Sequence, residues 1–180
     1  MFGEWFGAVS SGGGGVVVPA TGTSTEADIR TRCASLLTAL VPSVQSNVRF
    51  REHRYDQDFT TWCENNQECL RMFAIRDTLG PYQPAITNTD IEWRQVEVEL
   101  LVAYPRTSRY GATKTDVSRD VLIRSDLHEI ESTIGLRGYY NISDLASLLV
   151  DESRQDIIGL DETVAFLRFS YVFGFYRSMP

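Results

Sequence analysis

The chain has 180 residues, of which 43% are hydrophobic and 11% aromatic, so it can build one packed domain and is not disordered throughout. Its 17 Lys and Arg residues are outnumbered by 24 Asp and Glu residues, and the net charge of −7 argues against a protein that grips nucleic-acid phosphates. The sequence lacks the basic and apolar regions of a signal peptide and the roughly 18 apolar residues of a membrane helix, so we expect a protein made in the cytoplasm, with no membrane contact.

Residues 1–24 differ in composition from the rest of the chain and predict a flexible, Gly-rich N-terminal arm. Four consecutive glycines, Gly12 to Gly15, are costly to order. Aromatic residues near the start and a valine run after the glycines are candidates for protein contacts: Phe2, Trp5, Phe6, Val16, Val17 and Val18. Two interpretations remain open. The arm either packs on its own domain or, as we favour, reaches a neighbouring subunit.

Residues 25–180 predict a single domain. Apolar residues at helical spacing predict a helix at 26–40, which Pro42 ends. A polar, locally basic segment at 43–57 predicts a loop. Asp58 is a candidate cap for a short helix that contains Phe59, Trp62 and Cys63, and residues 69–76 then alternate as in a strand.

Residues 92–104 form a long alternating segment that predicts a strand. One face carries Val96, Val98, Leu100, Val102 and Tyr104, and the other carries Gln95, Glu97 and Glu99. Two carboxylates on one strand face could act as an acid–base pair. The same alternation equally describes the solvent or interface face of a strand, which is the interpretation we adopt.

The second half of the domain predicts a helix and a closing strand. Thr115 or Asp116 is the expected cap of a helix that runs to about Ile134. Residues 144–150 predict a short strand or helix, followed by an acidic loop. The last segment, 163–180, predicts a strand with Arg168 on its less apolar face and an apolar face of Leu167, Phe169, Tyr171, Phe173 and Phe175. We expect it to pair with the strand at 92–104. The fold class is therefore α+β, with a mainly antiparallel sheet and two or three helices packed on one face.

The sequence contains no motif of a known catalytic or cofactor-binding site. The glycine run is not followed by Gly-Lys-Ser/Thr, and neither Gly-x-Ser-x-Gly nor His-Glu-x-x-His is found. Three cysteines are an odd number, and Cys63 and Cys69 are too widely spaced for the usual zinc pair, so we expect free thiols. We expect no catalytic residue, no metal and no cofactor.

The order of these elements resembles the tail terminator proteins of long-tailed bacteriophages. The resemblance is carried by the helix at 26–40, the strand Glu97-Val-Glu-Leu-Leu-Val-Ala-Tyr-Pro105, the helix at 116–134 and the closing strand Phe166-Leu-Arg-Phe-Ser-Tyr-Val-Phe-Gly-Phe-Tyr176. The chain differs from the smaller members of that family in its Gly-rich arm and in the segment 51–70.

The resemblance implies a structural virion protein that is assembled in the host cytoplasm. Such a protein forms a ring, typically a homohexamer, at the head-proximal end of the tail. It contacts the tail tube protein on one side and a head-completion or stopper protein on the other, and DNA passes through its lumen. The candidate interface residues in the domain are Glu97, Glu99 and Arg168. Another neck or connector protein, or an adaptor module without catalytic activity, remains the alternative.

Overall fold

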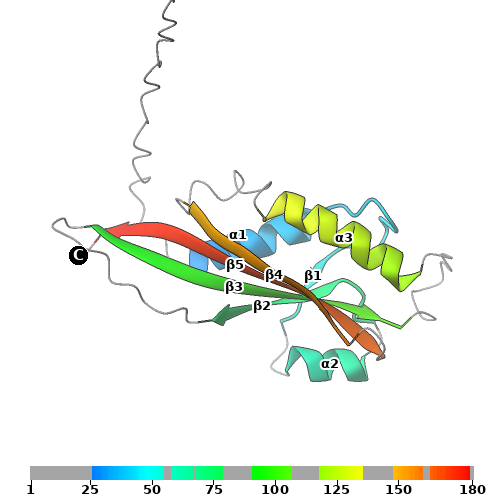
Figure 1. Ribbon diagram of the computed structural model, residues 1–180. Helices are drawn as coiled ribbons and strands as arrows, with labels where there is room; N and C mark the ends of the chain where they lie inside the picture. Colours follow the sequence, from blue (N-terminus) through cyan, green and yellow to red (C-terminus); the bar gives the residue numbers. More distant parts are fainter. Residues whose placement is uncertain are drawn as a thin grey trace, which may run out of the picture.

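The computed structural model describes residues 26–54, 58–66, 68–78, 91–106, 118–135, 148–159 and 163–178. Within these residues, three helices and one mixed five-stranded sheet form an α+β fold, as the sequence predicted (Figure 1). The elements are α1 (Glu26–Ala39), β1 (Arg51–Glu52), α2 (Phe59–Asn65), β2 (Met72–Thr78), β3 (Ile91–Pro105), α3 (Arg119–Thr133), β4 (Leu148–Ile158) and β5 (Val164–Ser178).

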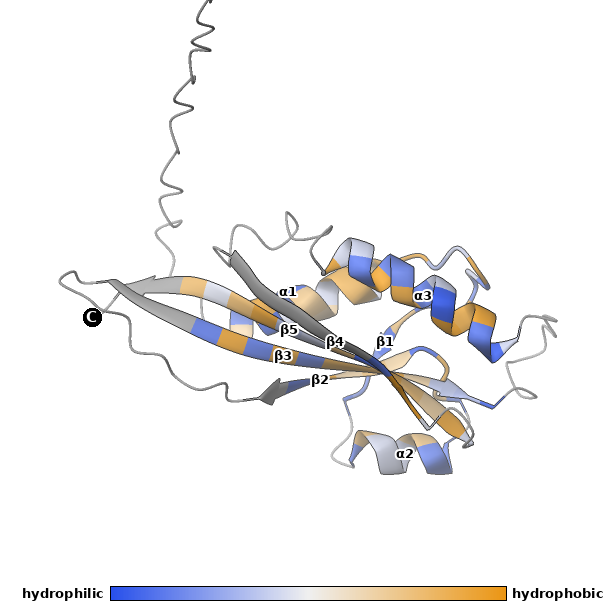
Figure 2. Cartoon of the chain, in the orientation of Figure 1, coloured by the Kyte–Doolittle hydropathy of each residue, from blue (hydrophilic) through white to orange (hydrophobic). Residues whose placement is uncertain are grey.

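The sheet has the strand order β1-β2-β3-β5-β4. β1 and β2 are parallel, and the other three pairs of neighbours are antiparallel. β3 and β5 pair along their whole length, from Ile91↔Ser178 to Pro105↔Val164, which confirms the predicted pairing of the two long alternating segments. Hydrophobic and hydrophilic residues alternate visibly along β3 (Figure 2).

The main core lies between the sheet and helices α1 and α3. The even-numbered residues of β3 from Val96 to Tyr104 and the odd-numbered residues of β5 from Ala165 to Phe175 face it, because side chains alternate along a strand and opposed residues share a face. α1 contributes Ile29, Cys33 and Leu37, which are at most 1% exposed. Burying one large apolar side chain contributes about 1.5–3 kcal/mol to stability, so this layer is the largest source of stability in the described part.

The opposite face of the sheet carries α2 at one end (Figure 1). Two helices thus share one face as predicted, while the third lies on the other face. Phe59 and Cys63 of α2 pack in a second cluster with Cys69, Met72, Leu101, Ala103, Val164 and Phe166. Asp58 caps α2 as predicted, because its Oδ1 accepts hydrogen bonds from the backbone N–H groups of Thr60 and Thr61, at 3.0 and 3.2 Å.

Three predicted elements differ in the structure. The acidic loop predicted after residue 150 is part of β4, an edge strand that tolerates charged residues and whose register shifts at Asp151 break the alternation that identifies a strand. α3 begins after Ser118 rather than after Thr115 or Asp116. The predicted loop 43–57 contains the two-residue strand β1, which is too short to show any periodicity.

Candidate functional site

The structure places three of the predicted interface residues on one face of the sheet. Glu97 and Glu99 of β3 and Arg168 of β5 point to the same side as α2, because Arg168 lies opposite Leu101 and residues 97, 99 and 101 share a face. All three side chains are half-buried in the single chain. The other predicted contact residues, Phe2, Trp5, Phe6, Val16, Val17 and Val18, lie outside the described residues.

Hydrogen bonds and ion pairs cross this polar face. Ser170 Oγ donates to Glu97 Oε1 at 2.7 Å, and Arg168 Nη2 lies 2.9 Å from Asp156 Oδ2 of β4. The Arg168 and Asp156 side chains are 33% and 53% exposed, so water weakens their attraction and the pair contributes little to stability. Such a face can be buried against a protein surface of complementary charge, because the charged groups of the two surfaces can pair.

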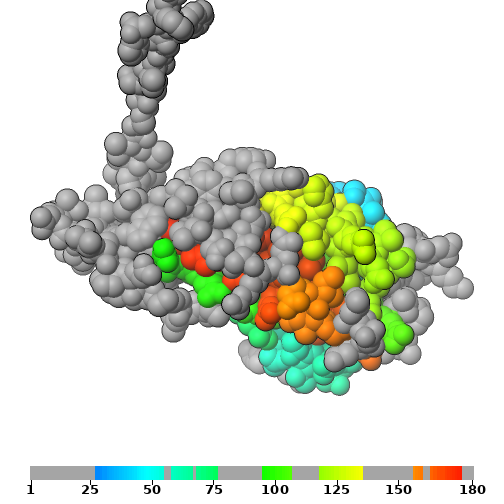
Figure 3. Space-filling view, viewed as in Figure 1, coloured from blue at the N-terminus to red at the C-terminus, as the bar shows by residue number. Residues whose placement is uncertain are grey.

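β4 adds two apolar residues to the surface that the sequence analysis missed. Ile157 and Ile158 are 40% and 41% exposed, although they belong to a strand. The end of β4 lies at the molecular surface between α3 and α2 (Figure 3). The adjacent β-branched residues Ile157-Ile158 were the available signal in the sequence, and the prediction of an acidic loop obscured it.

Both outer strands of the sheet have one side without a strand partner among the described residues. β4 pairs only with β5, and β1 pairs only with β2. The two edges are unlike, because β4 is an 11-residue strand with register shifts and β1 has two residues. Unpaired strand edges are the usual place for one chain to add to another.

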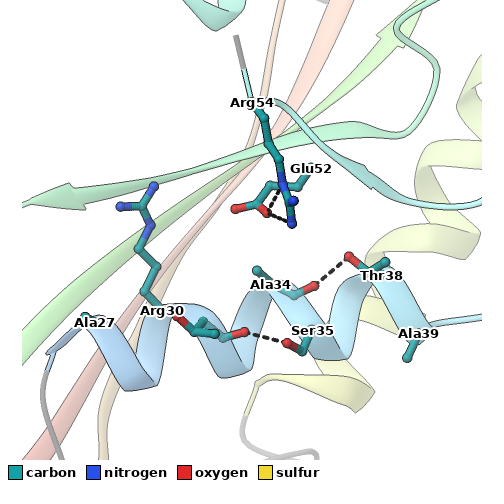
Figure 4. A pocket seen from close by; sticks show the side chains of 9 residues that line it. Ala27, Arg30, Ala34, Ser35, Thr38, Ala39, Glu52 and Arg54 are labelled. Atoms are coloured by element: carbon teal, nitrogen blue, oxygen red, sulfur yellow. Dashed lines mark hydrogen bonds and ion pairs between the residues drawn. The ribbon is translucent and has the colours of Figure 1, made fainter. Parts of the chain in front are cut away.

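A groove lies at the β1 edge, between α1 and the end of β1 (Figure 4). Its volume is about 790 Å³, and its lining residues are Ala27, Arg30, Thr31, Ala34, Ser35, Thr38, Ala39, Glu52 and Arg54. Glu52 and Arg54 form an ion pair at 3.0 Å across from the helix. Of the predicted interface residues, the three that the structure describes, Glu97, Glu99 and Arg168, do not line this groove.

The most extensive polar network in the described part is structural. Arg71 is fully buried, and its five N–H donors reach Asp126 twice and the backbone carbonyls of Val44, Gln45 and Val48, all at 2.7–2.8 Å. Tyr104 Oη donates to Asp126 Oδ2 at 2.9 Å. Burial raises the pKa of Asp126, while Arg71 and Tyr104 oppose that effect by stabilising the carboxylate.

This network ties a loop, the sheet and α3 together rather than forming a reaction centre. Every guanidinium donor is already used, and both Arg71 and Asp126 are 0% exposed. The sequence analysis did not identify it, because its partners lie as far apart as 55 residues in the chain.

The described residues offer no group of three or more His, Cys, Asp or Glu side chains that could hold a metal ion. All three cysteines are free and buried, and burial raises the pKa of the Cys33 thiol to about 12. None of the helices in the described ranges is long and apolar enough to span a membrane. Comparison with models of known protein families found no match, and comparison with curated proteins found none either.

Proposed function

We propose that this protein is a structural component of a bacteriophage tail. It forms a ring at the head-proximal end of the tail tube, stops tube polymerisation and joins the tail to the head. The proposal combines the resemblance in the order of elements with one structural observation, the open sheet with two unlike edges.

The two edges support a head-to-tail arrangement of identical subunits. In such an arrangement, one edge of each copy contacts the other edge of the next copy, so all copies use the same two surfaces. The chain of copies closes into a ring if a whole number of the rotations that relate neighbours makes 360°. A closed ring leaves no unpaired copy of either surface, and this fixes the number of subunits. The value of six comes from the family resemblance, and six copies of 20.3 kDa make about 122 kDa.

The dimensions of the sheet also suit an assembly part. β3 and β5 have 15 residues each and are therefore about 50 Å long. α1 and α3, with 14 and 15 residues, are only about 21–23 Å long. The strand pair extends beyond the helices that cover its core face (Figure 1). Long strands that project from a small core are available to contact a second protein.

The acidic composition is compatible with DNA passing through such a ring. A basic passage would hold the phosphates of the DNA, whereas an acidic or neutral one would release them. We therefore expect the lumen to be lined on balance by acidic or neutral groups. A lumen ringed by Arg49, Arg51 or Arg54 would contradict this part of the proposal.

The test has two arms. Light scattering and negative-stain images of the purified full chain should show a ring of about 122 kDa for six copies of 20.3 kDa. Phage particles made without the protein should have tails of irregular length or tails that are not joined to heads. A strict monomer at every concentration, with and without tail tube protein, contradicts the ring and favours an adaptor module. Normal tails joined to heads in its absence contradict the terminator role.

A further inference from the structure

The strand β2 continues beyond the end of its outer neighbour β1. Only Met72 and Phe73 of β2 have partners in β1, and a further backbone bond runs from the N–H of His53, which directly follows β1, to Phe73 O at 2.7 Å. β2 extends to Thr78. Among the described residues, the outer edge of β2 from residue 74 to residue 78 therefore has no strand partner.

The α1 groove borders this open edge. Backbone groups alternate in direction along a strand, so the carbonyl of Ile75 faces the same side as that of Phe73, two residues earlier. Arg30 of α1, which lines the groove, donates from Nη2 to Ile75 O at 3.1 Å. The Arg30 side chain therefore donates to a carbonyl of β2 that would accept a backbone N–H if a strand lay beside β2 at this point.

The helical wall of the groove suits small apolar side chains. Ala27, Ala34 and Ala39 present methyl groups along it. The hydroxyl groups of Ser35 and Thr38 donate to the carbonyls of Thr31 and Ala34 at 2.8 Å. Since these hydroxyls are hydrogen-bonded within the helix, an apolar occupant would not deprive them of a partner.

We propose that Val16–Val18 of the N-terminal arm binds in this groove as an added strand on the outer edge of β2. Three consecutive β-branched residues have a high strand propensity and present compact side chains to a wall of this kind. Main-chain hydrogen bonds to the β2 edge supply the affinity, as in other cases of strand addition. This docking site is not part of the ring proposal and does not depend on it.

The position of the arm in the chain makes this segment the natural occupant. The arm leads directly into α1, which forms one wall of the groove. Residues 19–25 separate the valines from Glu26, and when extended they span up to about 25 Å. α1 itself is about 21 Å long. The valines can therefore reach the groove of their own chain or that of an adjacent copy.

Disulfide cross-linking in the full chain tests the proposal. We would introduce Val17→Cys together with Thr31→Cys, an exposed position in the groove, and oxidise the protein mildly. The native cysteines are buried and do not compete for the oxidant. The matched control pairs Val17→Cys with Arg124→Cys, an exposed position on α3. Non-reducing gels give the rate of disulfide formation for both pairs, and thermal melts confirm that both variants fold.

The expected result is cross-linking through residue 31 at least about tenfold faster than through residue 124. A product of twice the chain mass identifies the arm of an adjacent copy, and a compact product of single-chain mass identifies the arm of the same chain. Either product supports the docking site. Equal rates for the two pairs, or no cross-link through residue 31, overturn it, even if light scattering shows a ring. A ring can also be absent while the cross-link forms, so the two proposals fail independently.

A proline substitution separates strand addition from loose contact. Val16→Pro removes a backbone N–H beside residue 17 and cannot complete a strand ladder. In the chain that carries Val17→Cys and Thr31→Cys, this change should slow cross-linking about tenfold, as the loss of one or two backbone hydrogen bonds implies. Val16→Thr, which keeps the N–H and the β-branch, should leave the rate within about twofold of the original. An unchanged rate in the proline variant contradicts the added strand.

Discussion

Arg71 and Asp126 form an ion pair in which both side chains are completely shielded from water. Arg71 Nε lies 2.7 Å from Asp126 Oδ2, and Nη2 lies 2.7 Å from Oδ1, so the contact is bidentate. Arg71 has a positive φ of 56°, a strained conformation for a residue with a side chain. The Phe50 ring centroid lies 5.6 Å from the guanidinium carbon. Asp126 and the Phe50 ring thus fix the position of the Arg71 side chain.

Replacing Asp126 with Asn should destabilise the protein severely. The substitution leaves the Arg71 guanidinium buried without a counter-charge, and loss of one partner of such a pair costs about 3–5 kcal/mol. The free energy of unfolding from urea titration checks this. Asp120→Asn, at an exposed position in the first turn of the same helix, should cost no more than about 1 kcal/mol. A loss below about 1 kcal/mol for Asp126→Asn would contradict a structural role for the pair.

Tyr104→Phe should remove one hydrogen bond and change the response of stability to alkaline pH. The lost bond to Asp126 is worth about 1.5–3 kcal/mol, since its acceptor is charged. Burial raises the pKa of Tyr104 well above its ordinary value. The unfolded chain therefore loses this proton near pH 10 while the folded chain keeps it, so stability falls as the pH rises above 10.

The pH effect can be isolated by comparing the two chains. Other tyrosines titrate in the same range, so only the difference between wild type and Tyr104→Phe reports on residue 104. The fall in the free energy of unfolding between pH 9.5 and 11 should be smaller in the Phe variant. Equal slopes for the two proteins would show that Tyr104 ionises as readily in the folded state as in the unfolded one.

Ile158→Lys should disrupt self-association while leaving the subunit folded. Ile158 is 41% exposed on the edge strand β4, so a charge there meets water in the single chain but would be buried in a contact between copies. Light scattering should give a mass near 20.3 kDa for the variant. Val41→Lys is the matched control, because Val41 is 56% exposed but lies in the loop after α1. If Ile158→Lys assembles as the wild type does, the β4 edge is not part of the interface.

Deleting residues 1–20 should weaken assembly without lowering the melting temperature of the monomer. The four-glycine run gives these residues reach without directing a fold, so we expect them to act between copies rather than within one. Thermal melts at low concentration and light scattering at high concentration measure the two effects separately. A truncated monomer that melts well below the full chain would identify the arm as an internal brace.

The parts of the fold that the sequence predicted are those with a continuous local pattern. β3 alternates between polar and apolar residues at 95–100, the odd positions of β5 from Leu167 to Phe175 are apolar, and the buried residues of α1 recur at helical spacing. β4 lacked such a pattern because its register shifts, at Leu149/Asp151 and Asp151/Arg154, move residues from one face to the other. An edge strand also requires fewer apolar residues, so its charged residues indicated a loop.

In the candidate interface, too, the sequence predicted only the part that has a local pattern. Alternation placed Glu97 and Glu99 on one strand face, and pairing with β5 brought Arg168 to that face. The groove beside α1 depends on where chain segments end in three dimensions, which no local pattern encodes. Arg71 is the clearest example. Its sequence neighbours are apolar, and only the folded chain supplies five acceptors to a buried cation.

The loop at residues 44–48 is held in place by three of its backbone carbonyls, which accept hydrogen bonds from Arg71. These hydrogen bonds come from the side chain of Arg71, which directly precedes β2 and is paired with Asp126 of α3, so the loop cannot open without exposing the buried cation. Its local opening free energy should therefore approach that of global unfolding. The amide of Val48, which donates to Gln45 O at 3.1 Å, should exchange its hydrogen as slowly as the amides in the centre of the sheet. A surface loop should thus behave, on the timescale of hydrogen exchange, as part of the core.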